Sequence, residues 1–193
     1  MEQMQSGLSR IQKKDLLDLA RQTIGDHLNA GSPLPKISKE PSFHKKAATF
    51  VTLNISGKLR GCIGNLEPVG SLWESVRDNA RSAAFHDHRF SPLSTDEFDG
   101  VSIDISILST PCLLEYEDSS DLIRKIRPGV DGVILSDGRR GATFLPQVWG
   151  QLQSPELFLG QLCQKAGLED GAWLEGRLEI KVYQVFSFGE DDV

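Results

Sequence analysis

The chain of 193 residues has no long hydrophobic run and no excess of positive charge. No apolar stretch approaches the ~20 residues that a membrane-spanning helix requires, so we predict no membrane span. The first ten residues are polar and do not contain the apolar segment of a secretion signal. The net charge is -6, which argues against a non-specific nucleic-acid binder, because neutralising phosphates requires clustered Lys and Arg.

Cysteine and histidine are scarce, and their spacing does not form a recognisable metal site. None of the three cysteines, Cys62, Cys112 and Cys163, stands at metal-ligand spacing. His86 and His88 are one residue apart, and on a helix such side chains diverge, because two ligands of one ion stand at i and i+4. We therefore predict no metal and no cofactor. Three cysteines leave at least one thiol unpaired, which indicates a reducing, cytoplasmic location.

The chain does contain enough apolar sequence for a globular core. Its hydrophobic content of 39% and charged content of 25% are ordinary for a folded protein. One core usually holds up to about 250 residues. We therefore predict a single domain over residues 1–193, with an ordered core over 9–188.

Periodic patterns place both helices and strands along the chain. Helices are predicted over residues 10–29, from Ser71 onward, over 121–127 and from Ser154 onward, with capping residues at three of these starts. The first helix should end at Gly31, Ser32, Pro33 and Pro35, followed by a plain loop to residue 46. Alternating apolar residues predict strands over 49–55, 59–63, 101–107, 130–135, 141–145 and 178–188.

These elements indicate an α+β fold. The dipeptides Ser56-Gly57 and Asp137-Gly138 lie between pairs of strands, where they favour hairpins. Hairpins and helices are interspersed without a repeating βαβ pattern. The sequence therefore predicts a mainly antiparallel sheet flanked by helices.

The segment over residues 59–68, LRGCIGNLEP, is the best candidate for a functional site. On a regular strand Leu59 and Ile63 share one face, and Arg60 and Cys62 share the other. The Arg60 guanidinium would then be able to favour a thiolate, or to clamp a carboxylate or phosphate.

Two glycines flank the cysteine in this segment. A glycine inside a strand marks a bulge, a tight bend or the close approach of another backbone or a ligand. Bared backbone amides around Cys62 would be able to hold an anion. We therefore predict a small anionic ligand, contacted by Arg60, Gly61, Gly64, Asn65 and Glu67. The structural alternative is that Cys62 is a small buried hydrophobe and that the glycines only shape a bulge.

Other polar residues allow two interpretations each. His86 is either a general base for Cys62 or a cation at a helix end. Asp87 and Arg89 should pair with each other or fix a turn. Asp104 lines either a polar cleft or a solvent-facing strand. Asp131, Arg139 and Arg140 are interpreted as parts of a solvated hairpin turn.

Several motifs together resemble the AMMECR-domain family, also called AmmeMemoRadiSam system protein A. The resemblance begins with Arg60-Gly61-Cys62-Ile63-Gly64 and spans about residues 11–185. One departure is His88, where the family commonly carries proline, and this weakens a catalytic or metal role for His88. The other matching runs are NARSAAF (79–85), DHRF (87–90), RPGVDGV (127–133), ATFLPQVW (142–149) and KAGL (165–168).

The resemblance implies a larger and a smaller lobe, with the Cys62 segment lining a cleft between them. It also implies association with Memo-type and radical-SAM-type proteins, but it supplies no substrate.

Three functional interpretations follow. We favour a binding or accessory protein that uses the RGCIG segment, because no second catalytic residue is fixed by spacing. The first alternative is an enzyme in which Cys62 is a nucleophile or acid–base group, with His86 or Glu67 as the base. The second alternative is a nucleic-acid-associated regulator, which only scattered basic residues support.

Overall fold

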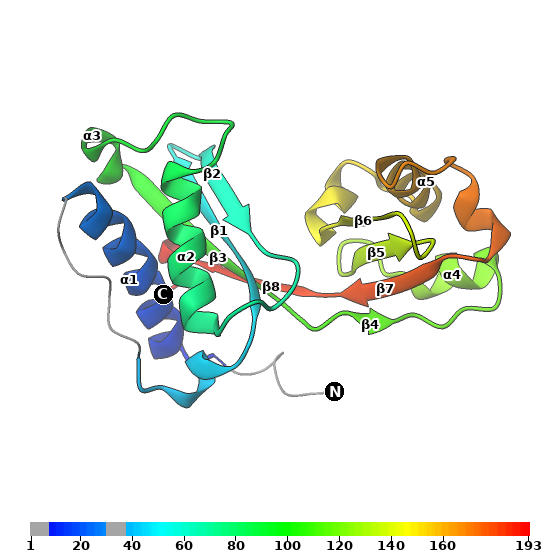
Figure 1. Ribbon diagram of the computed structural model, residues 1–193, viewed down its shortest axis with the longest axis horizontal. Helices are drawn as coiled ribbons and strands as arrows, with labels where there is room; N and C mark the ends of the chain where they lie inside the picture. Colours follow the sequence, from blue (N-terminus) through cyan, green and yellow to red (C-terminus); the bar gives the residue numbers. More distant parts are fainter. Residues whose placement is uncertain (1–7, 30–37) are drawn as a thin grey trace. The chain divides into compact units, whose positions relative to one another are not determined.

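The computed structural model describes residues 8–29 and 38–193, and they form two compact units (Figure 1). Unit 1 comprises the chain up to residue 108 together with 186–193, and unit 2 comprises residues 109–185. Each unit contains one four-stranded sheet. The predicted α+β fold, with mainly antiparallel pairing and a larger and a smaller lobe, is therefore confirmed. The cleft between the lobes stays a prediction.

The sheet of unit 1, called sheet 1, has the strand order β2-β1-β3-β8. Strand β1 (Ala48–Ile55) runs antiparallel to both β2 (Lys58–Gly64) and β3 (Val101–Leu108), and β8 (Val185–Gly189) forms one edge. The predicted inward residues Val51 and Leu53 of β1 and those of β3 are buried, and Ile55 is half-buried at the end of β1. The predicted hairpin at Ser56-Gly57 is also confirmed, because both residues adopt the positive φ that such a tight turn requires.

Two capped helices pack on the apolar face of sheet 1 (Figure 1). Helix α1 (Arg10–Leu28) begins with a capping box between Ser9 and Gln12. Helix α2 (Leu72–Phe85) begins with a second capping box at Ser71. Both starts were predicted, because a capping box depends only on residues three positions apart. The short helix α3 (Thr95–Phe98) follows α2.

The connection between α1 and β1 is more than a plain loop. The predicted helix stop at Gly31, Ser32, Pro33 and Pro35 lies outside the described residues. Beyond it, a 3-10 helix, η1 (Pro41–His44), places Phe43 fully in the core. The Phe43 ring packs against Trp73 with ring centroids 5.6 Å apart. The plain-loop prediction is therefore wrong for this part, because one buried aromatic anchors it.

Unit 2 is built on a sheet with the order β4-β7-β5-β6. The predicted hairpin is confirmed as β5 (Gly132–Ser136) and β6 (Gly141–Phe144). The other regular elements are β4 (Cys112–Leu113), β7 (Glu179–Tyr183), α4 (Ser119–Lys125), α5 (Pro155–Lys165) and the 3-10 helices η2 (Pro146–Gly150) and η3 (Ala172–Glu175).

The segment predicted as one last strand over residues 178–188 forms two strands. Strand β7 belongs to the sheet of unit 2 and β8 to sheet 1, and Gln184 separates them. The acidic end after β8 forms a short 3-10 helix, η4 (Glu190–Asp192). Within unit 1, both carboxylate oxygens of Glu190 accept hydrogen bonds from Arg21.

Across residues 8–29 and 38–193, no helix has both the length and the apolar character needed to cross a bilayer.

Candidate functional site

A β-bulge interrupts β2 in the middle of the predicted site. The register of β2 against β1 shifts between Leu59 and Gly61, so Arg60 has no residue opposite it. The extra residue reverses the alternation of side chains beyond it. Leu59 is therefore 44% exposed, whereas Ile63 packs against the core. The prediction that these two residues share a face is wrong for this reason.

The Arg60 side chain forms its hydrogen bonds with other residues of unit 1. Its Nε lies 2.8 Å from Oε1 of Glu97 in α3, and its Nη2 lies 3.1 Å from Oε2. The same Nη2 donates to the Ser91 carbonyl oxygen at 2.9 Å. The hydrogen bond from Arg60 lowers the pKa of Glu97 to about 2. A two-pronged pair of this kind fixes the guanidinium, so Arg60 ties β2 to α3.

Other segments of the chain pass so close to Gly61 and Gly64 that neither position has room for a side chain. A Cβ atom on Gly61 would overlap the carbonyl oxygen of Ala83 in α2, and one on Gly64 would overlap the carbonyl oxygen of Thr49. That same Thr49 oxygen accepts a hydrogen bond from the Asn65 N–H at 2.9 Å. Neither glycine has a positive φ. Space rather than backbone conformation therefore excludes a larger residue at these two positions.

The backbone of Cys62 is held by two side chains from the loop after α2. Oδ2 of Asp87 accepts a hydrogen bond from the Cys62 N–H at 2.9 Å, and Nη2 of Arg89 donates to the Cys62 carbonyl oxygen at 3.2 Å. Asp87 and Arg89 also form an ion pair at 2.7 Å, as the sequence predicted. The Cys62 amide is therefore occupied by a carboxylate of the same chain.

The Cys62 side chain lies on the side of sheet 1 opposite α1 and α2. Thr52 stands opposite both Cys62 in β2 and Asp104 in β3, so the three residues form a row across three strands. The Thr52 hydroxyl donates to the Cys62 Sγ at 3.3 Å. We call this side the polar face; its half-buried polar residues and the cysteine are Thr52, Asn54, Cys62, Ser102, Asp104 and Ser106.

Asp104 supplies the carboxylate of the polar face. Its Oδ2 accepts a hydrogen bond from the Asn54 side-chain amide at 2.9 Å. Burial raises the pKa of Asp104, and the nearby carboxylates of residues 190–192 also raise this pKa. The hydrogen bond from Asn54 acts in the opposite direction. Asp104 is therefore the carboxylate acceptor among the half-buried side chains of the polar face.

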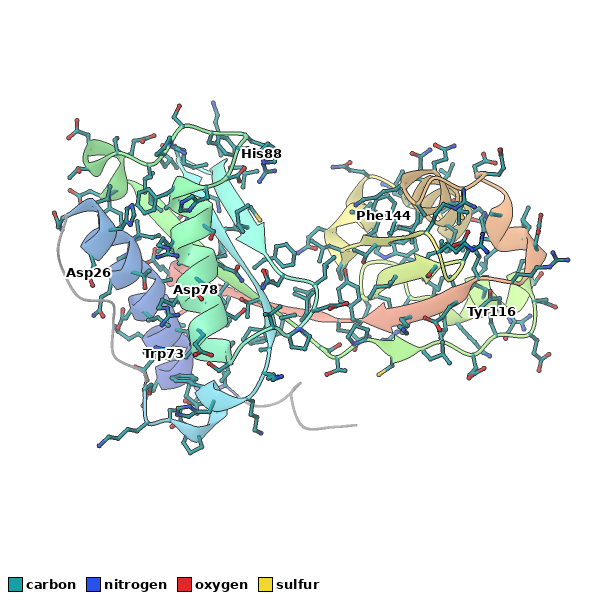
Figure 2. All side chains as sticks on the ribbon, viewed as in Figure 1. Asp26, Trp73, Asp78, His88, Tyr116 and Phe144 are labelled. Carbon is teal, nitrogen blue, oxygen red and sulfur yellow. The ribbon has the colours of Figure 1, made fainter. Side chains whose placement is uncertain are left out.

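Two other predicted site residues do not meet Cys62. His86 ends α2 through its backbone N–H, which donates to Ser82 at 2.8 Å, and its side chain is exposed. Within the described ranges no hydrogen bond or ion pair joins His86 or Glu67 to Cys62. His88, labelled in Figure 2 on the loop after α2, is exposed as well.

The three cysteines differ in their surroundings, and no disulfide joins those of the described chain. Cys112 is exposed, Cys62 is half-buried, and Cys163 is fully buried in the core of unit 2. Burial raises the pKa of the Cys163 thiol. In the part of the chain that the structure describes, no group of three or more His, Cys, Asp or Glu residues is arranged to hold a metal ion.

Sequence reasoning missed Thr52 and Asn54 as parts of this site. The signal was present, because both occupy the polar positions of an alternating strand, and Asp104 occupies such a position in another strand. The pairing of these strands with the cysteine strand was not available from the sequence. Cross-strand register, rather than residue type, brings the group together.

Comparison with known proteins identifies the family. The AMMECR1 family pattern matches residues 17–188. A protein from Methanothermobacter thermautotrophicus is 37% identical over 188 residues, which cover 95% of this chain and 97% of that protein. A Thermofilum pendens protein is 36% identical, with coverage of 91% and 88%.

A solved structure has the same fold. The crystal structure of the uncharacterised protein PH0010 from Pyrococcus horikoshii matches with a TM-score of 0.78 and 33% identity. The match covers 92% of this chain and 91% of that one. The chain belongs to the AMMECR1 family.

Proposed function

We propose that this protein is a binding or accessory protein, and that the polar face around Cys62 receives hydrogen-bond donors of the molecule that it binds. One observation supports this proposal. Cys62, Thr52 and Asp104 form a half-buried row, while the arginines near the cysteine are already paired with carboxylates. The row presents groups for recognition, and no base contacts the thiol within the described ranges.

The charges favour a donor-bearing ligand over a free anion. Arg60 is paired with Glu97, and Arg89 with Asp87, so neither guanidinium carries uncompensated charge. Asp104 adds a carboxyl group, which accepts from the Asn54 side-chain amide, to the polar face. An ammonium, amide or hydroxyl group would therefore be bound more favourably there than a carboxylate or phosphate. The small anionic ligand predicted from the sequence is the alternative.

The test is affinity capture with the immobilised full chain. Wild type and Cys62→Ala are incubated with cell extract, and bound proteins and metabolites are identified by mass spectrometry. Memo-type and radical-SAM-type proteins are the first candidates for partners. We expect at least one specifically bound molecule to be captured about tenfold less by Cys62→Ala, at an almost unchanged melting temperature, because the thiol is a contact and not a core group.

The matched control is Cys112→Ala, which removes an exposed thiol from the other unit. It should capture the same molecules as wild type. Equal capture by all three proteins would contradict the assignment of the polar face as the binding surface.

A second function is favoured by one specific contact. The Cys62 Sγ accepts a hydrogen bond from the Thr52 hydroxyl. A hydroxyl group that donates to the sulfur stabilises a thiolate, which is the nucleophilic form of cysteine. In this reading the protein is an enzyme that uses Cys62.

Alkylation of the folded protein separates the two functions. Exposure alone predicts that iodoacetamide modifies Cys112 first, half-buried Cys62 next and buried Cys163 last. The binding function predicts this order, with Cys62 slower than Cys112 by about tenfold. Site-resolved mass spectrometry over time measures the rates. Faster labelling of Cys62 than of the exposed Cys112 would support the enzyme instead.

A further inference from the structure

The loop after α2 places a carboxylate and a guanidinium against the outer edge of β2. Cys62 pairs with Thr52 of β1, yet its N–H and carbonyl oxygen are taken by Asp87 and Arg89, so both groups point away from β1. β2 is an edge strand of sheet 1. A neighbouring strand would supply one acceptor and one donor at this point. Asp87 and Arg89 supply the same two groups.

The hydrogen bonds of the Asp87 carboxylate are made with Arg89 and with the Cys62 N–H. The Asp87 side chain is only 2% exposed, and it accepts three hydrogen bonds from Arg89 in addition to the one from Cys62. The hydrogen bonds from Arg89 and Cys62 keep the pKa of Asp87 well below its usual range, although burial acts in the opposite direction. The carboxylate is therefore ionised and fully satisfied at neutral pH.

The bulge explains why Cys62 requires such support. Arg60 and Gly61 immediately precede it, and a bulge leaves the strand locally bent and its regular hydrogen bonding interrupted. The interrupted ladder alone therefore holds this part of β2 less firmly than a regular strand. Hydrogen bonds on both sides of the Cys62 α-carbon fix the direction of its side chain toward Thr52.

We propose that Asp87 and Arg89 are positioning residues for Cys62, and that they orient its thiol on the polar face by acting on its backbone. The inference rests on the proposed function, in which that thiol is a contact. Neither residue needs to touch the bound molecule. Their effect on binding is exerted through the orientation of Cys62.

The experiment uses the full chain with Asp87→Ala and, as a milder change, Arg89→Gln. The Cys62 amide should exchange with deuterium at least about tenfold faster in Asp87→Ala, whereas the amides of Gly61 and Ile63, which face β1, keep their rates. Capture of the bound molecule should fall about tenfold in both variants, as in Cys62→Ala.

The matched control is Arg127→Gln, which breaks a similar arginine–carboxylate pair with Asp131 in unit 2. It should lower stability but leave the Cys62 exchange rate and the capture unchanged. If Arg89→Gln accelerates exchange but captures like wild type, the positioning role is overturned and the proposed function stands.

If Cys62→Ala itself captures like wild type, the proposed function fails, and alkylation decides the positioning role. Iodoacetamide should then modify Cys62 about fivefold faster in Arg89→Gln than in wild type, relative to Cys112 in the same molecule, because the freed thiol leaves Thr52. An unchanged ratio would overturn the positioning role.

Discussion

Gly61→Ala is expected to lower the free energy of unfolding of unit 1 by roughly 2–4 kcal/mol. The added methyl group would overlap the carbonyl oxygen of Ala83. That oxygen belongs to the backbone of α2 and cannot rotate away, so the helix must move off β2. Because Ala83 is itself buried in the core of unit 1, the movement opens that core. Urea unfolding followed by far-ultraviolet circular dichroism measures the loss.

Gly100→Ala is the matched control in the same unit. A Cβ atom there would lie 3.5 Å from the Glu97 carbonyl oxygen, an ordinary contact. Its stability should remain within about 0.5 kcal/mol of wild type, because surface substitutions without a special contact usually have small effects. Equal stability of the Gly61 and Gly100 variants would show that α2 does not approach β2 as described.

The elements that the sequence predicted correctly are those determined by neighbours in the chain. The capping boxes at Ser9 and Ser71 involve residues three positions apart, and the turn at Ser56-Gly57 involves adjacent residues. Alternation within β1 and β3 also identified which residues are buried. Such patterns are local, so a single sequence contains the information that they require.

The site could be predicted only in outline, because contacts between distant segments determine it. The segment around Cys62 was identified, but the bulge at Arg60 was not, and one extra residue exchanges the two faces of a strand. Arg60 forms hydrogen bonds with Glu97, which is 37 positions away. The Cys62 amide donates to Asp87, which is 25 positions away. No local pattern signals such pairings. The functional role of Cys62 stays a prediction.

Asp131 shows the same limit in unit 2. Its position beside a hairpin predicted a solvated carboxylate, and the structure shows that this is wrong: the residue is 1% exposed. Its carboxylate forms a two-pronged pair with Arg127, accepts a hydrogen bond from the backbone N–H of Arg127, and accepts another from the Gln184 side chain at 2.8 Å. The Asp131 carboxylate can be buried because these hydrogen-bond donors replace the water molecules that would otherwise solvate it.

Asp131→Ala is therefore expected to destabilise unit 2 by about 3 kcal/mol at neutral pH. The substitution leaves the Arg127 N–H and the Gln184 amide without this acceptor. Thermal and urea unfolding of the full chain measure the change. Asp170→Ala is the control, because it removes the same charge from an exposed position of unit 2 and should have little effect.

Acid should reduce the difference between wild type and Asp131→Ala. Burial acts to raise the pKa of Asp131, but the hydrogen bonds from Arg127 and Gln184 outweigh it and lower the pKa below its ordinary value of 3.8. The unfolded chain therefore binds the proton more readily than the folded one. The stabilisation is complete above the ordinary pKa and is lost as the pH falls through the lower, folded value. The difference in unfolding free energy between the two proteins should therefore become smaller as the pH falls below 3.8. A difference that stays constant over this range would show that the Asp131 carboxylate is not the group that stabilises unit 2.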